Sequence, residues 1–180
     1  MRTTIDNLLS VAECCNLISR AESLGFEPAT IFDKEGKSVR VDSYRNNDRV
    51  IIDDSALAGM LWERILRSDA LVEDDEWKPC GLNERIRLYR YDEGQYFATH
   101  QDHPFIRSDL ERSFQTVIIF LNEDYTGGRT AFQDIEIEPR TGRGFVFLHH
   151  IMHEGTPVIK GTKYALRTDV MYRHVTAACE

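Results

Sequence analysis

The sequence predicts a mainly β protein, a sandwich or barrel with helices packed outside it. Helical spacing of apolar residues occurs only in the first part of the chain. From Arg85 onward the chain forms short runs that are rich in β-branched and aromatic residues. Turn-forming residues separate these runs. Two helices followed by many strands are typical of sandwiches and barrels with external helices.

We expect the first helix to begin after Ser10, because Ser10 and Glu13 have the spacing of a capping box. Gly25 is typical of a helix end. Between them apolar residues recur at helical spacing, at Leu17, Ile18, Ala21 and Leu24.

A second helix is expected from about Asp54 to Arg67. Its apolar residues Leu57, Leu61 and Ile65 share one side. The polar stretch from Thr30 to Arg49 is interpreted as strand and loop, and the stretch from Asp69 to Asn83 as mostly loop.

Four later runs predict strands, and the loops between them contain glycine and acidic turn residues. The predicted strands are Arg85–Tyr91, Phe114–Leu121, Gly144–Leu148 and Tyr164–Tyr172.

Size and charge limit the classes of function. The chain has 180 residues, which fits a single domain spanning residues 1–180. A net charge of -8 disfavours general nucleic-acid binding, although it leaves room for a local basic pocket.

With no membrane-spanning run and no secretory signal in the sequence, we expect a soluble cytoplasmic protein. Cys14, Cys15, Cys80 and Cys179 form no CxxC pair, so we expect reduced thiols.

His100-Gln101-Asp102 is the clearest chemical signal. Side chains two apart in a strand point to one face, so His100 and Asp102 can reach the same metal ion. A second histidine would complete a two-histidine, one-carboxylate face with positions left open, which suits iron(II). Spacing gives His153 only a modest lead, and the choice stays open among His103, His149, His150, His153 and His174.

Three ordered motifs resemble the prolyl 4-hydroxylase-like branch of the iron(II)/2-oxoglutarate dioxygenases. The first is YDEGQYFATHQD, from Tyr91 to Asp102, and the second runs from Thr116 to Thr130. The third is PRTGRGFVF, from Pro139, followed by HEGTPV from His153 and GTKY from Gly161. Together the motifs cover residues 85–173, about half the chain.

The resemblance implies a double-stranded β-helix, or jelly roll, as the catalytic core over about residues 85–173, with residues 1–84 as helical and strand support. It also implies that His153 joins His100 and Asp102 as the metal-binding and catalytic residues. The expected cofactors are iron(II), 2-oxoglutarate as co-substrate and dioxygen, with ascorbate as a candidate reductant.

The resemblance further implies that Lys163, ten positions after His153, pairs with the far carboxylate of 2-oxoglutarate. Arg167 shares a strand face with Lys163 and is the alternative cation. By the same resemblance Tyr91 and Thr130 contact the co-substrate.

We therefore expect an oxygenase that hydroxylates an unactivated C–H bond, in a prolyl or other residue of a protein or peptide. The alternative is a hydroxylase of a free amino acid or a small natural-product intermediate. A zinc hydrolase and a non-enzymatic scaffold are weaker alternatives. His149 and His150 have no assigned role, and the segment Arg45–Arg49 is either a substrate-recognising lid or a solvated loop.

Overall fold

The fold is organised around a large antiparallel sheet, and the structure is a computed structural model that describes residues 2–32, 35 and 37–175. Along the sheet the strand order is β1-β14-β10-β17-β7-β5-β2, with β6 beside β17 and β9 beside β10. These strands are β1 (Arg2–Ile5), β14 (Gly144–Leu148), β10 (Glu111–Phe120), β17 (Lys163–His174), β7 (Arg85–Tyr91), β5 (Asp48–Asp53), β2 (Glu27–Pro28), β6 (Trp77–Leu82) and β9 (Ile106–Ser108). Strands from both predicted parts of the chain, residues 1–84 and 85–173, pair within this sheet.

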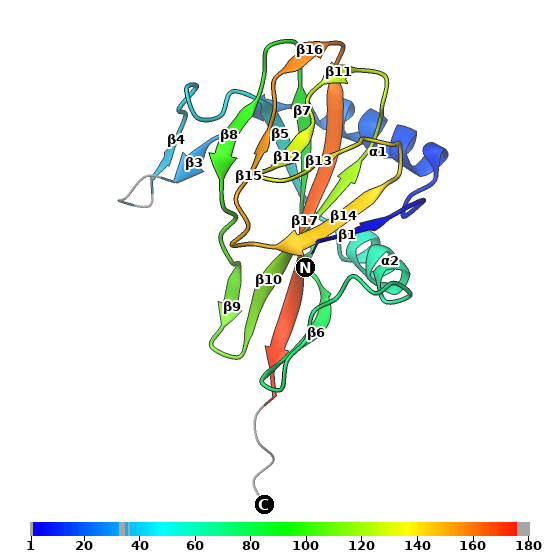
Figure 1. Ribbon diagram of the computed structural model, residues 1–180, viewed down its shortest axis with the longest axis vertical. Helices are drawn as coiled ribbons and strands as arrows, with labels where there is room; N and C mark the ends of the chain where they lie inside the picture. The colour runs from blue at the N-terminus through cyan, green and yellow to red at the C-terminus, as the bar shows by residue number, and fades with distance from the viewer. Residues whose placement is uncertain (1, 33–34, 36, 176–180) are drawn as a thin grey trace, which may run out of the picture.

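A smaller sheet of four strands, in the order β13-β12-β15-β8, packs against the large one (Figure 1). Its strands are β13 (Glu136–Ile137), β12 (Thr130–Phe132), β15 (His153–Gly155) and β8 (Phe97–His100). Aromatic residues from both sheets form a buried cluster between them, which comprises Phe120, Phe132, Ile137, Phe145 and Phe147. Two facing antiparallel sheets of this kind form the predicted jelly roll.

Two further strand pairs lie at the periphery. β11 (Thr126–Gly127) pairs with β16 (Val158–Lys160), and β3 (Ile31–Phe32) pairs with β4 (Ser38–Val39).

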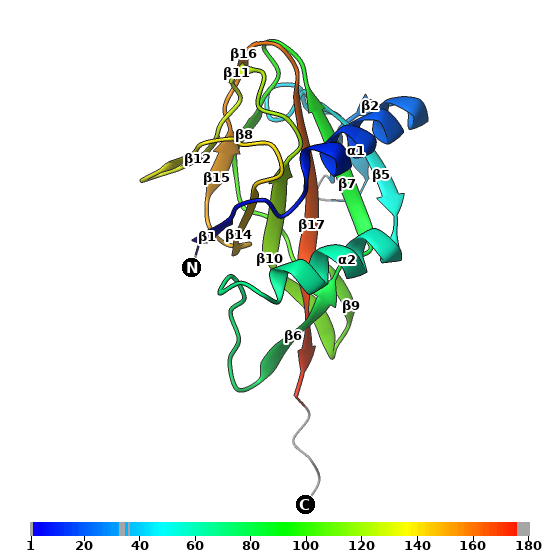
Figure 2. The same cartoon turned by 90° about the vertical axis from the view of Figure 1, so that its right-hand side faces the viewer.

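Both predicted helices are present and cover the other face of the large sheet (Figure 2). In α1 (Val11–Leu24) the Ser10 and Glu13 side chains form the predicted capping box, and Gly25 follows the last turn. In α2 (Ser55–Ile65) the carboxylate of Asp54 accepts a hydrogen bond from the backbone N–H of Leu57. The buried sides of the helices and the sheet share one hydrophobic core.

The loop predicted from Asp69 to Asn83 was wrong in its second half, because β6 occupies residues 77–82. Pro79, Gly81 and a lysine weaken the strand signal of this segment. It becomes a strand because β17 is long enough to pair with it beyond the end of β7. The first strand, β1, pairs with β14 and was not predicted.

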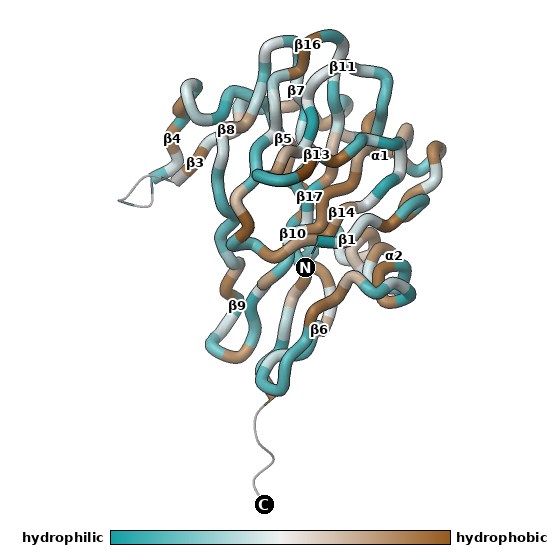
Figure 3. The backbone as a smooth tube through the Cα atoms, in the orientation of Figure 1, coloured by the Kyte–Doolittle hydropathy of each residue, from teal (hydrophilic) through white to brown (hydrophobic). Residues whose placement is uncertain are grey.

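Hydrophobic residues are concentrated in β14 and β10 in the middle of the molecule, and hydrophilic residues occupy loops around it (Figure 3). Among the described residues no helix is long and apolar enough to cross a membrane. Cys14, Cys15 and Cys80 are free thiols, and Cys179 lies outside the described residues.

Candidate active site

Two histidines face each other across the edge of the smaller sheet. His100 is the last residue of β8, His153 is the first residue of β15, and the two are direct partners in the antiparallel pairing. Asp102 lies two residues beyond the end of β8, so the prediction that it belongs to the same strand was wrong. Its backbone N–H instead donates to the His149 carbonyl at 3.0 Å, which keeps the chain close to the strand's path.

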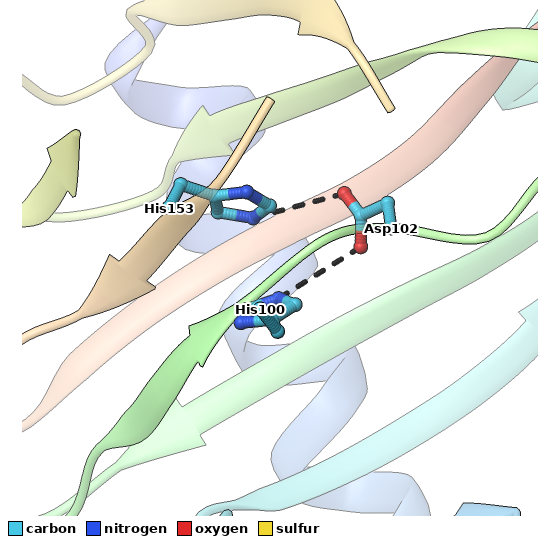
Figure 4. A group of neighbouring side chains, drawn as sticks. All are labelled: His100, Asp102 and His153. Carbon is cyan, nitrogen blue, oxygen red and sulfur yellow. Dashed lines mark ion pairs between the residues drawn. The ribbon is translucent and has the colours of Figure 1, made fainter. Parts of the chain in front are cut away.

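The structure brings the side chains of His100, Asp102 and His153 together (Figure 4). One ligand atom from each lies within 4.8 Å of the other two. Nε2 of His100 is 3.9 Å from Oδ1 of Asp102, and Nε2 of His153 is 3.7 Å from Oδ2. All three residues are buried.

Backbone carbonyls orient both imidazole rings. Nδ1 of His100 contacts the Ala98 carbonyl at 2.7 Å, and Nδ1 of His153 contacts the Ile151 carbonyl at 3.0 Å. A carbonyl only accepts, so each Nδ1 carries the proton and each Nε2 presents a lone pair. Phe97 stacks on the His100 ring at a centroid distance of 3.6 Å and holds it from one side.

The charges of these groups fit a bound cation. Burial lowers the pKa of His100 to about 4 and lowers that of His153 as well, so both rings are neutral at pH 7. Burial opposes ionisation of Asp102, but the positive charge of Arg167 and the hydrogen bond from Thr116 favour the carboxylate, and its pKa lies below the ordinary value. Two lone pairs and a carboxylate therefore face one another. Ring nitrogens and carboxylate oxygens that point at one another with no N–H or O–H between them are typical ligands of a divalent metal. This set of ligands fits iron(II).

Asp102 is held from outside the cluster by two partners. The Thr116 hydroxyl donates to Oδ2 at 2.5 Å, and Nη2 of Arg167 lies 3.1 Å from Oδ1. Arg167 also pairs with the buried Asp169 at 3.0 Å.

The contact of Thr116 continues into a chain of buried hydrogen bonds. Because the Thr116 hydroxyl proton goes to Asp102, its oxygen accepts from Nδ1 of His149 at 2.8 Å. Nε2 of His149 then accepts from the Ser113 hydroxyl at 2.8 Å, and that hydroxyl accepts from the Phe105 N–H. Burial lowers the pKa of His149 to about 4, which agrees with the neutral ring that this chain requires.

The other candidate histidines do not join the cluster. His103 and His150 are exposed, and the ring of His174 packs edge-on against Trp77 with centroids 4.9 Å apart. His149 is buried, but it reaches Asp102 only through Thr116.

Lys163 lies on the other side of the cluster, in the lining of a small cavity of about 40 Å³. It is 4% exposed and donates to the Gly128 carbonyl at 2.6 Å. No carboxylate partner of Lys163 occurs among the described residues, and burial lowers its pKa to about 8. Tyr91 and Thr130 are buried in the same lining.

Arg167 lines this cavity as well, but its charge is already engaged by two carboxylates. Of these two cations, Lys163 is therefore the one without an acidic partner among the described residues.

The segment Arg45–Arg49 is not a solvated loop. Arg45 and Asn47 are 5% and 1% exposed, and Nε of Arg45 donates to the Asn47 side chain at 2.7 Å. Sequence reasoning also missed Thr116 and Ser113. No local pattern singles them out, because they lie among Glu111, Arg112 and Gln115 in the polar first half of β10.

Comparisons with known proteins show which proteins this chain is similar to. The family model of the 2OG-Fe(II) oxygenase superfamily matches residues 86–168. A protein of Acanthamoeba polyphaga mimivirus named as a prolyl 4-hydroxylase is 25% identical over 89% of this chain and 69% of its own length. A PKHD-type hydroxylase of Idiomarina loihiensis is 32% identical over 68% of this chain, which spans only 57% of that relative.

Solved structures share the fold. A prolyl hydroxylase of Trichoplax adhaerens, in complex with a peptide fragment of a hypoxia inducible factor oxygen degradation domain, superposes with a TM-score of 0.72. The match covers 96% of this chain and 83% of that one, at 18% identity.

Proposed function

Because the chain belongs to the 2OG-Fe(II) oxygenase superfamily, in its prolyl 4-hydroxylase-like branch, we propose that it hydroxylates a prolyl or other residue in a protein or peptide. The observation that carries the proposal is the convergence of His100, Asp102 and His153, whose lone pairs face one point in a buried site. We assign these three residues as the ligands of iron(II).

Iron(II) with 2-oxoglutarate and dioxygen supplies the chemistry that converts a C–H bond into an alcohol, with succinate and carbon dioxide as the other products. Ascorbate is the proposed reductant. The protein supplies position and charge. The carbonyls of Ala98 and Ile151 fix the tautomers of the two histidines, and Thr116 and Arg167 fix the carboxylate.

Lys163 is the proposed partner of the far carboxylate of 2-oxoglutarate. A buried ammonium with no acidic partner is costly unless an anion joins it, so its place in the small cavity supports this role. Tyr91 and Thr130 line the same cavity and are proposed to contact the co-substrate.

A peptide substrate is supported by the named activity of the mimivirus relative and by the peptide bound to the Trichoplax adhaerens enzyme. The free amino acid or small-molecule substrate is the alternative, and both would use the same metal site. The cytoplasmic location stays a prediction.

The test is 2-oxoglutarate decarboxylation by the purified full chain with iron(II), with and without prolyl peptides, measured as succinate formation. His100→Ala and Asp102→Ala are expected to abolish succinate formation and to weaken Mn(II) binding, while the circular dichroism spectrum stays unchanged. Full turnover by either variant under limiting iron would refute the ligand assignment.

His150→Ala is the matched control, because His150 is exposed and lies next to the buried His149 outside the cluster. It is expected to keep both succinate formation and Mn(II) affinity. Turnover with added Zn(II) alone and no 2-oxoglutarate would favour a hydrolase instead.

A further inference from the structure

A second, larger cavity of about 720 Å³ opens beside the proposed metal site, and its lining is strongly basic. Four arginines line it, namely Arg45, Arg49, Arg87 and Arg167. Among the described residues of the lining, Asp102, the proposed metal ligand, is the only one with a carboxylate. Such an excess of positive charge is unexpected in a chain whose net charge is -8.

Arg45 is held rigidly at the wall of this cavity. Its guanidinium carbon lies 4.3 Å from the centroid of the Phe97 ring and 4.7 Å from that of Tyr89, so the group is stacked against two aromatic rings. Nε donates to Asn47, but the buried Nη2 has no hydrogen-bond partner among the described residues. A preorganised fork with an unused donor is a feature of oxyanion recognition.

Arg49 and Arg87 add charge that is only partly balanced. Arg49 donates to the carbonyl and the hydroxyl of Thr30, and no carboxylate of the described chain pairs with it. Arg87 contacts Asp169 at 3.2 Å, and Asp169 is shared with Arg167. Asp102 and Asp169 together balance Arg87 and Arg167, so the unbalanced positive charge of the lining comes from Arg45 and Arg49.

The pKa of Tyr89 reflects the positive charge of the surrounding arginines. Burial raises the pKa of its phenol, but Arg45, Arg167 and Arg87 outweigh that effect and lower the pKa to about 8. Three guanidinium groups thus favour a negative charge at one buried position near the metal site.

This cavity is distinct from the one that contains Lys163. Both cavities share the wall formed by Tyr89, Phe97, His100, Asp102 and Arg167. Of these two cavities, Lys163 lines the smaller one alone, whereas Arg45, Arg49 and Arg87 line the larger one and not the smaller. The cation proposed for 2-oxoglutarate and the three arginines therefore serve different ligands.

We propose that the substrate carries an oxyanion, a carboxylate or a phosphate, which binds Arg45, Arg49 and Arg87 while its reactive C–H bond faces the metal site. The inference rests on the proposed function, since it names the substrate class of the same site. A free amino acid, an acidic peptide and a phosphorylated peptide share this chemistry, and experiment distinguishes them.

The first test detects the anion site without turnover. The full chain, loaded with Mn(II) and the unreactive co-substrate analogue N-oxalylglycine, is titrated with sulfate at constant ionic strength, and thermal unfolding is followed. We expect sulfate to raise the unfolding temperature saturably. Arg49→Gln and Arg87→Gln are each expected to weaken the apparent sulfate affinity about tenfold to a hundredfold, the effect of losing a hydrogen bond between charged groups.

Arg173→Gln is the matched control, because Arg173 is an exposed arginine at the far end of β17 and its side chain is 67% exposed. This control removes the same charge and is expected to leave the sulfate response unchanged. Absence of a saturable response, or an equal response in Arg49→Gln and Arg173→Gln, would overturn the proposal.

The second test compares matched pairs of substrates, each measured by binding to the Mn(II) and N-oxalylglycine form and by hydroxylation with iron(II). The pairs are prolyl peptides with aspartate or asparagine beside the proline, the same peptides with phosphoserine or serine, and L-proline or its amide. The anionic member of one pair is expected to bind at least about tenfold more tightly, and Arg49→Gln should remove that preference. The pair that shows the preference identifies the source of the oxyanion.

Equal binding of both members in every pair would overturn the inference. Succinate formation without any peptide separates this result from failure of the proposed function. If that uncoupled activity is present, only the substrate class is wrong, and if it is absent while the anionic preference persists, only the reaction is wrong.

Discussion

The Thr116 hydroxyl donates a hydrogen bond of 2.5 Å to Asp102 Oδ2, and this bond links the proposed metal ligand to the interior of the large sheet. Thr116 belongs to the central strand β10 and is fully buried. Asp102 lies beyond the end of β8, where no strand pairing fixes its side chain. The hydroxyl therefore supplies orientation that the backbone does not.

We expect Thr116→Val to weaken Mn(II) binding about tenfold to a hundredfold, the range for groups that orient metal ligands. Valine keeps the branched shape but cannot donate to Asp102, and it leaves Nδ1 of His149 without an acceptor. Isothermal titration with Mn(II) measures the affinity. The free energy of unfolding should also fall by about 1–3 kcal/mol, because a buried donor loses its partner.

Thr168→Val is the control for that loss of stability. Thr168 is also fully buried and donates to the Asn83 carbonyl at 2.6 Å, with no contact to the metal ligands. Both variants should lose stability, but only Thr116→Val should lose metal affinity. Equal Mn(II) affinities would show that Thr116 has a structural role alone.

Titration of Lys163 should weaken the use of 2-oxoglutarate at alkaline pH. Burial lowers its pKa to about 8 in the folded protein, so the ammonium is lost as the pH rises through that value. kcat/KM for 2-oxoglutarate should therefore fall above about pH 8, as steady-state kinetics across pH 6–10 would measure. Lys163→Arg should remove the inflection, because arginine stays charged. If the inflection persists in that variant, Tyr89, whose pKa also lies at about 8, is the group that titrates.

The lowered pKa of Lys163 should also make the stability of the protein increase at alkaline pH. The pKa of Lys163 in the folded protein lies below its ordinary value of 10.5, so the unfolded chain binds the proton more tightly. The contribution of Lys163 to the free energy of unfolding is thus lowest below pH 8 and rises as the pH increases from 8 to 10.5. Lys163→Met, which removes the buried charge, should abolish this rise in urea unfolding experiments.

Lys163 and Arg167 should differ in their effect on co-substrate use. Lys163→Met is expected to raise KM for 2-oxoglutarate at least about tenfold, because a charge-assisted contact is lost. Arg167→Gln should raise it less, since the guanidinium is engaged by Asp102 and Asp169. Initial rates of succinate formation at saturating iron(II) provide the comparison, and the reverse order would assign the co-substrate carboxylate to Arg167.

Local sequence signals predicted the helices and the apolar strands well. The capping box of Ser10 and Glu13 marks a helix start that needs no tertiary contact, and the runs in β7 and β14 match the predicted ranges. β6 could not be predicted in this way, because its residues have weak strand propensity and pair only through the length of β17.

The candidate site also has parts that the local sequence predicts and parts that only the fold reveals. The spacing of His100 and Asp102 predicted that the two side chains meet, although Asp102 lies beyond the strand that the prediction assumed. The choice of His153 needed the family resemblance. The arginine cavity combines Arg45, Arg87 and Arg167 from distant strands and loops, so no local pattern predicts it. Its charge becomes visible only once the fold places these side chains around Tyr89.

Two glycines should respond oppositely to alanine. Gly59 is exposed within α2, and a Cβ there would meet nothing within 4 Å, so Gly59→Ala should raise the free energy of unfolding by about 0.5–1 kcal/mol. Gly142 has φ +80°, and a Cβ would lie 1.9 Å from the Leu9 carbonyl oxygen. The backbone N–H of Leu9 also donates to the Gly142 carbonyl at 3.1 Å, and this clash would break that bond. Gly142→Ala should therefore cost more than about 2 kcal/mol, the sum of left-handed strain and the lost bond. Urea unfolding of both variants measures the difference, and a neutral Gly142→Ala would show that the segment around Leu9 can move away at little cost.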